Sequence, residues 1–329
     1  MPKKEKEPNS VETQDLVIFK ESQSSQSESI DKYTFETVDQ ENKIKLSTDY
    51  RPFGSGYQYS ILIDNQSLAP VSEMKIKVKF PKFLTLKRLY PNTIKIPQIK
   101  IEENLKLINL EFDELNEKTN KQIHLHFSPN SLDHIGEVRT IVTYVNNKDT
   151  VRVLDSRPAE ITLYSIIVEP KVVPSSFIRD FTQTPGIKKV IKSMGIGTGY
   201  NIDSEIYYAF LEQVFSNHNF QMVTKDIEKR ILWYFGTESV KKEDILAIGQ
   251  IVSNKIEIIA SSLNHYSLIS LITQITDDFK RLVVKNNIVN SKDKIFDLEC
   301  QSCGVVLPYF PHKSEYIECN NCNFSQLIW

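Results

Sequence analysis

Short runs of alternating apolar and polar residues dominate the first half of the chain. Residues 57–63 place Tyr, Tyr, Ile and Ile at every second position, and residues 74–80 do the same with Met, Ile, Val and Phe. A two-residue period is typical of a β-strand with one buried face. Further runs of this kind cover residues 84–89, 93–96, 105–112, 121–127, 137–145 and 161–168. We therefore predict an antiparallel, immunoglobulin-like β-sandwich over residues 31–168, because each strand needs a second sheet to cover its apolar face.

Helical and strand patterns succeed one another in the second half of the chain. Residues 204–215 carry apolar side chains at i, i+4 spacings, and residues 266–282 form a second helical stripe. Between them, residues 230–236 and 246–262 are strand-like, and the second run alternates as in a sheet covered mostly on one side. This order of helix, strands and helix predicts a small α+β domain over residues 177–284.

Two connecting segments separate these parts. Residues 169–176 contain two prolines, which cannot continue a β-ladder from inside, and we predict a hinge there. A short helix is predicted from Phe177, with Ser175 or Ser176 as its N-cap. Residues 285–295, rich in Asn and Lys, predict a linker before the last module.

The N-terminal tail is too polar to bury enough surface to order itself. Residues 1–30 combine Lys, Glu, Ser, Gln and Asn, and we predict a disordered tail. Within it, residues 15–19 read Asp-Leu-Val-Ile-Phe. This short apolar run predicts either a strand that docks on the following domain or a motif that adds to a partner's sheet.

Four cysteines near the end of the chain form the strongest motif. Cys300 and Cys303 make one CxxC pair, Cys319 and Cys322 make another, and 15 residues separate the pairs. Four thiolates suit tetrahedral Zn²⁺, and we predict a zinc ribbon over residues 296–329. Four protein ligands leave no position for a reactive water, so we expect one structural zinc ion.

The residues around these cysteines refine the prediction. Gly304 and Asn323 follow the second cysteine of each pair, where a tight turn favours a left-handed backbone. The charged residues from 297 to the end give a net charge of −3, which disfavours phosphate binding. We expect the aromatic side chains of this module to cover its small core or to dock on a protein.

Composition excludes several classes of function. The formal net charge of −2 gives no overall attraction for nucleic acid or acidic lipid. No apolar run approaches the roughly 20 residues of a membrane span, and the start of the chain lacks a secretory signal. Because the four cysteines sit in metal-binding pairs, we expect a protein of a reducing compartment, soluble and cytoplasmic.

Weaker motifs have simpler structural interpretations. Gly195, Gly197 and Gly199 follow a helix-like run at residues 188–194 and lack the pattern of a nucleotide-binding loop, so we expect a flexible connector. A metal site at His124 and His126, which share one face of a strand, lacks a third ligand. These histidines are therefore expected to face solvent.

A lysine stripe stands on one predicted strand. Its members are Lys75, Lys77, Lys79 and Lys82. We expect an edge strand kept soluble by its lysines, in preference to a surface for acidic lipid or peptide. No set of nucleophile, acid and base can be assembled from the sequence, so we expect no enzyme.

The order of β-sandwich, proline hinge and α+β domain resembles the appendage (ear) domain of the coatomer gamma subunit and of the large adaptins. The segments that carry this resemblance are residues 57–67, 74–81, 236–248, 255–262 and 267–279. It covers about residues 33–283. The chain differs from the family in its added zinc ribbon and in lacking the long helical solenoid to which coat appendages are attached.

The resemblance implies a non-enzymatic adaptor that binds short peptide motifs of protein partners through its platform, the α+β domain. In the family, the peptide pocket is built around an aromatic residue, often the Trp of a Phe-x-x-x-Trp run. The matching residues are Phe177 and Phe181, with Phe181 in place of the Trp. Coat-like proteins or small GTPases are the expected partners, with at most peripheral membrane association, no nucleic acid and no small-molecule substrate. The alternative is a zinc-ribbon transcription or nucleic-acid-associated factor.

Overall fold

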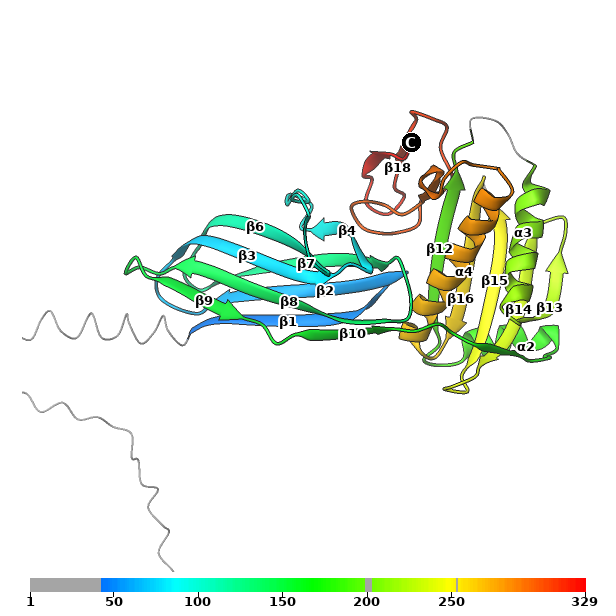
Figure 1. The fold of residues 1–329 in the computed structure, drawn as a ribbon, viewed down its shortest axis with the longest axis horizontal. Coiled ribbons are helices and arrows are strands. Elements are labelled where there is room, and N and C mark those ends of the chain that lie inside the picture. Colours follow the sequence, from blue (N-terminus) through cyan, green and yellow to red (C-terminus); the bar gives the residue numbers. More distant parts are fainter. Residues whose placement is uncertain (1–42, 199–202, 253) are drawn as a thin grey trace, which may run out of the picture.

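The structure is a computed structural model that describes residues 43–198, 203–252 and 254–329. An elongated β-rich domain leads into an α+β domain, and a small C-terminal module lies beside the junction of the two (Figure 1). The polar tail at residues 1–30 and its apolar run at residues 15–19 lie outside the described residues. No described helix is long and apolar enough to cross a membrane.

Two antiparallel sheets form the first domain and confirm the predicted β-sandwich. The first sheet has the order β1 (Ile44–Phe53), β2 (Gly56–Asn65), β7 (Thr119–Pro129), β4 (Leu84–Tyr90). The second has the order β10 (Ala159–Leu163), β8 (His134–Val145), β3 (Val71–Pro81), β6 (Leu105–Leu115), β5 (Lys100–Glu102), with β9 (Val151–Asp155) also paired to β8. The alternating apolar residues meet between the sheets, where the ring centroids of Phe80 and Phe127 are 4.9 Å apart.

Three details of this domain differ from the sequence prediction. Residues 93–96 form a loop, and β1, β5 and β9 were not predicted. The lysine-bearing strand β3 is not an edge strand, because it pairs with β6 on one side and β8 on the other. Its Lys75 lies opposite Glu111 of β6, so the stripe belongs to the outer face of a central strand.

A seven-stranded sheet forms the second domain. Its order is β11 (Val168–Pro170), β14 (Ile231–Glu238), β15 (Asp244–Val252), β16 (Lys255–Ser262), β12 (Lys188–Ile196), β17 (Ile295–Asp297), with β13 (Gln221–Asp226) paired to β14. Helices α3 (Ser204–Asn217) and α4 (His265–Lys285) cover one face, and α2 (Ser175–Gln183) packs on the other. Alternation along β14 directs Tyr234 toward α3 and Phe235 toward α2.

Several local predictions for this domain are wrong for identifiable reasons. Residues 188–194 form strand β12, because both of its edges are paired, one with β16 and one with β17. Strand β16 is buried on both faces instead of one. Helix α2 has Pro174 at its N-cap position, so neither of the two serines that follow is the cap.

The first two residues of the predicted hinge belong to the sheet. Glu169 and Pro170 lie in β11, which pairs with β14. Helix α4 contacts both domains, since Ile269 lies in the sandwich core and Gln274 accepts a hydrogen bond from the Ile166 backbone at 2.9 Å. The two domains therefore share packed side chains in addition to a linking segment.

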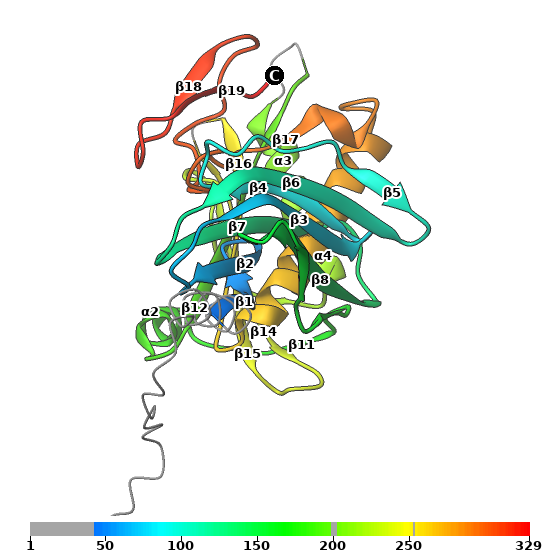
Figure 2. The same cartoon turned by 90° about the vertical axis from the view of Figure 1, so that its left-hand side faces the viewer.

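The C-terminal module is tied to the α+β domain from its first residues. The predicted linker at residues 285–295 includes the 3-10 turn Lys292–Lys294 and the start of β17, which extends the seven-stranded sheet beside β12. A two-stranded sheet follows, made of β18 (Tyr316–Glu318) and β19 (Ser325–Leu327). Figure 2 shows this module standing above the end of the sandwich, close to β4 and β17.

Candidate metal centre and the charged junction around it

The four cysteines converge on one point. Their Sγ atoms all lie within 4.8 Å of one another, and the pairs Cys300–Cys322 and Cys303–Cys319 are 3.6 Å apart. A tetrahedron of thiolates at a Zn–S distance of about 2.3 Å has edges of about 3.8 Å. The cluster can hold one metal ion, and its dimensions are consistent with zinc.

Two similar turns present the sulfurs. Gly304 has a φ of 76° and Asn323 a φ of 55°, so the left-handed residues predicted after each pair are confirmed. The Gly304 amide donates to the Cys300 carbonyl at 2.8 Å, and the Asn323 amide donates to the Cys319 carbonyl at 2.9 Å. Each turn thus brings two thiols to one side of a tight backbone loop.

Local polarity acts in opposite directions on two of the thiols. The backbone amide of Phe324 is the main cause that lowers the pKa of Cys322 to about 6, which favours its thiolate at neutral pH. Burial is the main cause that raises the pKa of Cys300 to about 12. A bound cation opposes the effect of burial, because it stabilises the thiolate directly.

Polar side chains of the sandwich hold one side of the module. Ser55 donates to the Glu299 carboxylate at 2.7 Å, and Asn92 donates to the Ser302 hydroxyl at 2.6 Å. The guanidinium of the buried Arg88 lies directly over Gly304, where a Cβ atom would overlap it. The residue after Cys303 therefore has two reasons to be glycine, its backbone conformation and this close approach.

Apolar packing holds the other side of the module against β12. A Cβ at Gly195 would overlap the Phe310 ring, and a Cβ at Gly197 would lie 2.7 Å from Trp329. The Phe310 and Trp329 rings stack at 5.3 Å. The flexible-connector interpretation of these glycines is therefore wrong, because Gly195 lies within β12 and both admit the aromatic rings of the module. Gly199 lies outside the described residues.

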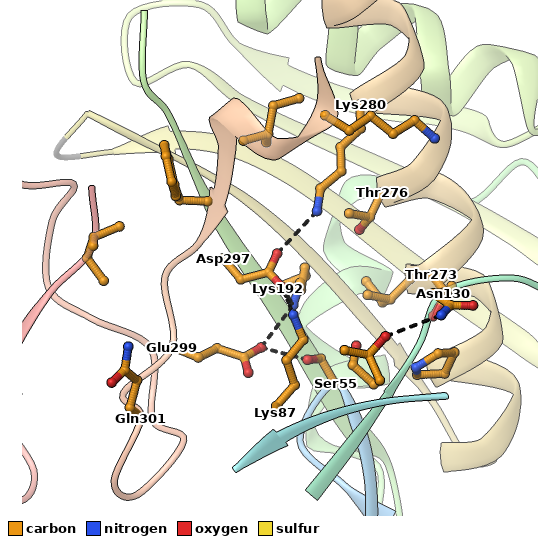
Figure 3. A pocket seen from close by; sticks show the side chains of 18 of the residues that line it. Ser55, Lys87, Asn130, Lys192, Thr273, Thr276, Lys280, Asp297, Glu299 and Gln301 are labelled. Carbon is orange, nitrogen blue, oxygen red and sulfur yellow. Dashed lines mark hydrogen bonds and ion pairs between the residues drawn. The ribbon is translucent and has the colours of Figure 1, made fainter. Parts of the chain in front are cut away.

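A cluster of charges fills the junction of the three parts. The Asp297 carboxylate contacts the Nζ atoms of Lys87 at 2.9 Å, Lys192 at 3.0 Å and Lys280 at 3.3 Å, and Lys192 also reaches Glu299 at 3.2 Å (Figure 3). The lysines come from β4, β12 and α4, so each packed element supplies one. We call these five residues the charged hub.

Burial and mutual charge shift the pKa values of three hub residues. Burial alone would raise the pKa of Asp297, yet the three lysines hold it well below its usual range. Lys192 is desolvated, but Glu299 and Asp297 raise its pKa above the ordinary value. Burial lowers the pKa of Lys280, Asp297 opposes this lowering, and the charges of Lys192 and Lys87 add to it.

A cavity of about 590 Å³ opens beside the hub. Its walls come from the sandwich, from α4 and from the C-terminal module, as Figure 3 shows for Asn130, Thr276 and Gln301. The sequence did not reveal the hub or the cavity, because Asp297 and Glu299 are acidic residues with no sequence neighbour that indicates a buried ion pair. A usable signal was Lys192, which occupies the same strand face as the buried Val190 and Met194.

The predicted peptide residues lie together on the side of α2 that faces the sheet. Phe181 is only 8% exposed, and its ring lies edge-on to Phe235 with the ring centroids 5.1 Å apart. Phe177 is half-buried, and its ring centroid lies 5.5 Å from that of Phe235. Phe181 therefore belongs mainly to the small core between α2 and the sheet. Phe177 is the member of the pair with accessible surface.

The two histidines of β7 have separate partners. His124 hydrogen-bonds with Ser60 at 2.8 Å, and His126 contacts Arg88 at 3.3 Å. Burial first, and then the charge of Arg88, lower the pKa of His126 to about 3. Both side chains are partly buried, so the expectation that they face solvent is wrong.

Neither a family model nor a curated protein sequence matches the chain. A GH20 exo-beta-N-acetylglucosaminidase from Vibrio harveyi is similar to it in structure with a TM-score of 0.26 and 11% identity, over 67% of this chain and 40% of that one. The major pilin SpaD from Corynebacterium diphtheriae gives a TM-score of 0.29 and 10% identity, over 65% of this chain and 60% of that one. The sporulation control protein Spo0M from Bacillus subtilis gives a TM-score of 0.21 and 9% identity, over 67% of this chain and 80% of that one.

Proposed function

We propose that this chain is a non-enzymatic adaptor whose α+β domain binds short peptide segments of protein partners, with one structural zinc ion in the four-cysteine cluster. The observation that carries this proposal is the order of elements. A β-sandwich leads through a short proline-containing segment into helix α2, an antiparallel sheet and two covering helices. That order resembles the sandwich and platform of coatomer gamma and adaptin appendages.

The surface beside α2 is the best candidate for the peptide site. Val173, Phe177 and Ile178 pack against the core beneath α2 while keeping part of their surface exposed, and Val172 is 84% exposed. A half-buried aromatic side chain with apolar neighbours suits the anchor residue of a short peptide. Lys171, whose Nζ lies 5.8 Å from the Phe235 ring centroid and pairs with Asp244 at 2.7 Å, adds a polar ion pair at the edge of this surface.

The cysteine cluster supports a structural role for the ion. All four ligand positions belong to protein sulfurs, so a substrate has no vacant coordination position. Two acidic side chains of the module, the half-buried Glu315 and the exposed Glu318, disfavour the alternative of a nucleic-acid-associated factor, because a phosphate backbone is attracted by Lys and Arg.

Affinity purification with a Phe177→Ser variant tests the adaptor proposal. Phe181→Ala is unsuitable, since removal of a buried phenyl ring costs about 3 to 5 kcal/mol of folding free energy and mixes binding with stability. We expect partners that co-purify with the wild-type chain, such as coat-like proteins or small GTPases, to be lost with Phe177→Ser. Tyr316→Ser is the matched control, because Tyr316 is an aromatic residue that is 67% exposed on the C-terminal module.

Two results would count against the adaptor. If Phe177→Ser retained every partner with an unchanged melting temperature, the surface beside α2 would not be the binding site. If the wild-type chain recovered RNA polymerase subunits or nucleic acid instead, the alternative function would be favoured.

A further inference from the structure

We propose that the cavity at the junction of the three parts binds a small phosphate-bearing anion, a ligand class independent of the peptide partners. The cavity volume of about 590 Å³ falls within the roughly 300 to 1,000 Å³ of small-molecule sites. Residues from the sandwich, from α4 and from the C-terminal module line it together. Such junctions between packed domains are preferred places for ligand sites.

Charge at the floor of the cavity favours an anion. Three ammonium groups, those of Lys87, Lys192 and Lys280, share only the carboxylates of Asp297 and Glu299. The hub therefore carries one net positive charge before Arg88, another lining residue, is counted. Across the rest of the lining, Arg88 lies near the Cys300 thiolate, and Lys292 pairs with Asp277, so the excess of positive charge is confined to the hub. An anion that enters the cavity relieves this excess of positive charge.

Hydrogen-bond donors remain available to such a ligand. Each ammonium group has three N–H donors, and Lys87 and Lys280 each direct one to Asp297. Their side chains are 42% and 20% exposed, whereas Lys192 is enclosed at 7%. Lys87 and Lys280 approach the cavity from opposite sides, one from the sandwich and one from α4 (Figure 3). Two lysines placed in this way can contact different oxygens of one phosphate group.

Thr276 marks the wall of the cavity beside Lys280. It lies one helical turn before Lys280 on α4, and its buried hydroxyl has no hydrogen-bond partner among the described residues. Burial is the main cause of the lowered pKa of Lys280, the carboxylate of Asp297 opposes it, and the charges of Lys192 and Lys87 add a smaller lowering. A bound phosphate group would favour the charged form of this lysine.

Calorimetric titration of the zinc-loaded full chain tests the proposal. Inorganic phosphate and ribose 5-phosphate are the two probes, with sodium chloride at equal ionic strength as the salt control. We expect both probes to bind, and Lys280→Gln to weaken binding at least tenfold. Asp297 keeps two lysine partners in that variant, so its fold is expected to persist. Lys242→Gln, which removes a 63% exposed lysine paired with Glu169, is the matched control and should bind normally.

The outcomes separate the possible sources of the anion. Tighter binding of ribose 5-phosphate than of inorganic phosphate would identify a site for a phosphorylated metabolite, and equal binding would identify a site for the phosphate group alone. The proposal fails if neither probe binds, if chloride produces the same heat, or if Lys280→Gln binds as the wild type does. Should Lys280→Gln misfold by circular dichroism, Lys87→Gln from the sandwich side replaces it, and undiminished binding there refutes the site.

Discussion

Asp297→Asn is the substitution that most directly tests how the three parts are held together. It keeps the size of the side chain and removes the charge on which three lysines converge, at 2.9, 3.0 and 3.3 Å. Lys192 keeps Glu299 at 3.2 Å, but Lys87 and Lys280 lose the carboxylate that they contact. The buried excess of positive charge in the hub then rises.

The expected loss can be bounded from the exposure of the partners. Removing one member of a buried ion pair costs about 3 to 5 kcal/mol, because the other charge is left without compensation. Asp297 is 19% exposed, and Lys87, at 42%, can recover water. We therefore expect the lower end of that range, about 3 kcal/mol of unfolding free energy.

Urea unfolding of the zinc-loaded chain at pH 7 measures the loss. Asp155→Asn is the matched control, since Asp155 forms a surface pair with Arg139 in which both side chains are more than 40% exposed. Exposed pairs contribute about 0 to 1 kcal/mol. The dependence of stability on acid pH gives a second measurement. Because the folded-state pKa of Asp297 is lowered, its contribution is complete above the unfolded-state pKa of about 3.9 and is lost as the pH falls below it.

The wild type should therefore lose more stability below about pH 4 than the Asn variant does. A cost of less than about 1 kcal/mol for Asp297→Asn, the value of an exposed pair, would show that Asp297 does not hold the three parts together. A parallel loss of stability in both proteins through the acid range would show the same.

Two further predictions concern the C-terminal module. The metal can be removed with a strong chelator or by the Cys303→Ser substitution. Either change should make residues 296–329 sensitive to protease, while the sandwich and the α+β domain stay resistant. It should also change the fluorescence of Trp329, which stacks on Phe310. Limited proteolysis followed by mass spectrometry checks this, and a native mass without zinc would contradict the metal assignment. Gly195→Val should displace the Phe310 ring and lower the free energy of unfolding by about 1 to 3 kcal/mol through overpacking. Gly54→Val is the control: it adds a side chain next to open space at a φ of 58°, so it should strain the backbone without exposing Trp329. Thermal unfolding with fluorescence distinguishes the two, and an undisturbed Trp329 signal in Gly195→Val would contradict the packing argument.

Local chemistry determined much of this protein from the sequence alone. The two-residue period of residues 57–63 and 74–80 requires an extended strand with one covered face, whatever lies elsewhere in the chain. The spacing of Cys300 and Cys303 requires a tight turn, and the left-handed backbone at Gly304 follows from it. These features are confirmed because neighbours in sequence decide them.

Tertiary structure alone decided which strands are central and where the charges meet. The lysine stripe of β3 looks like an edge because its outward pattern is the same in either position, and only pairing with both β6 and β8 makes it central. Residues 188–194 read as a helix until two neighbouring strands supply their hydrogen bonds. Lys87 and Asp297 lie 210 residues apart, so no local pattern joins them. Their contact depends on the register of two sheets and on the docking of the C-terminal module. Many weak interactions among the three parts together determine that arrangement.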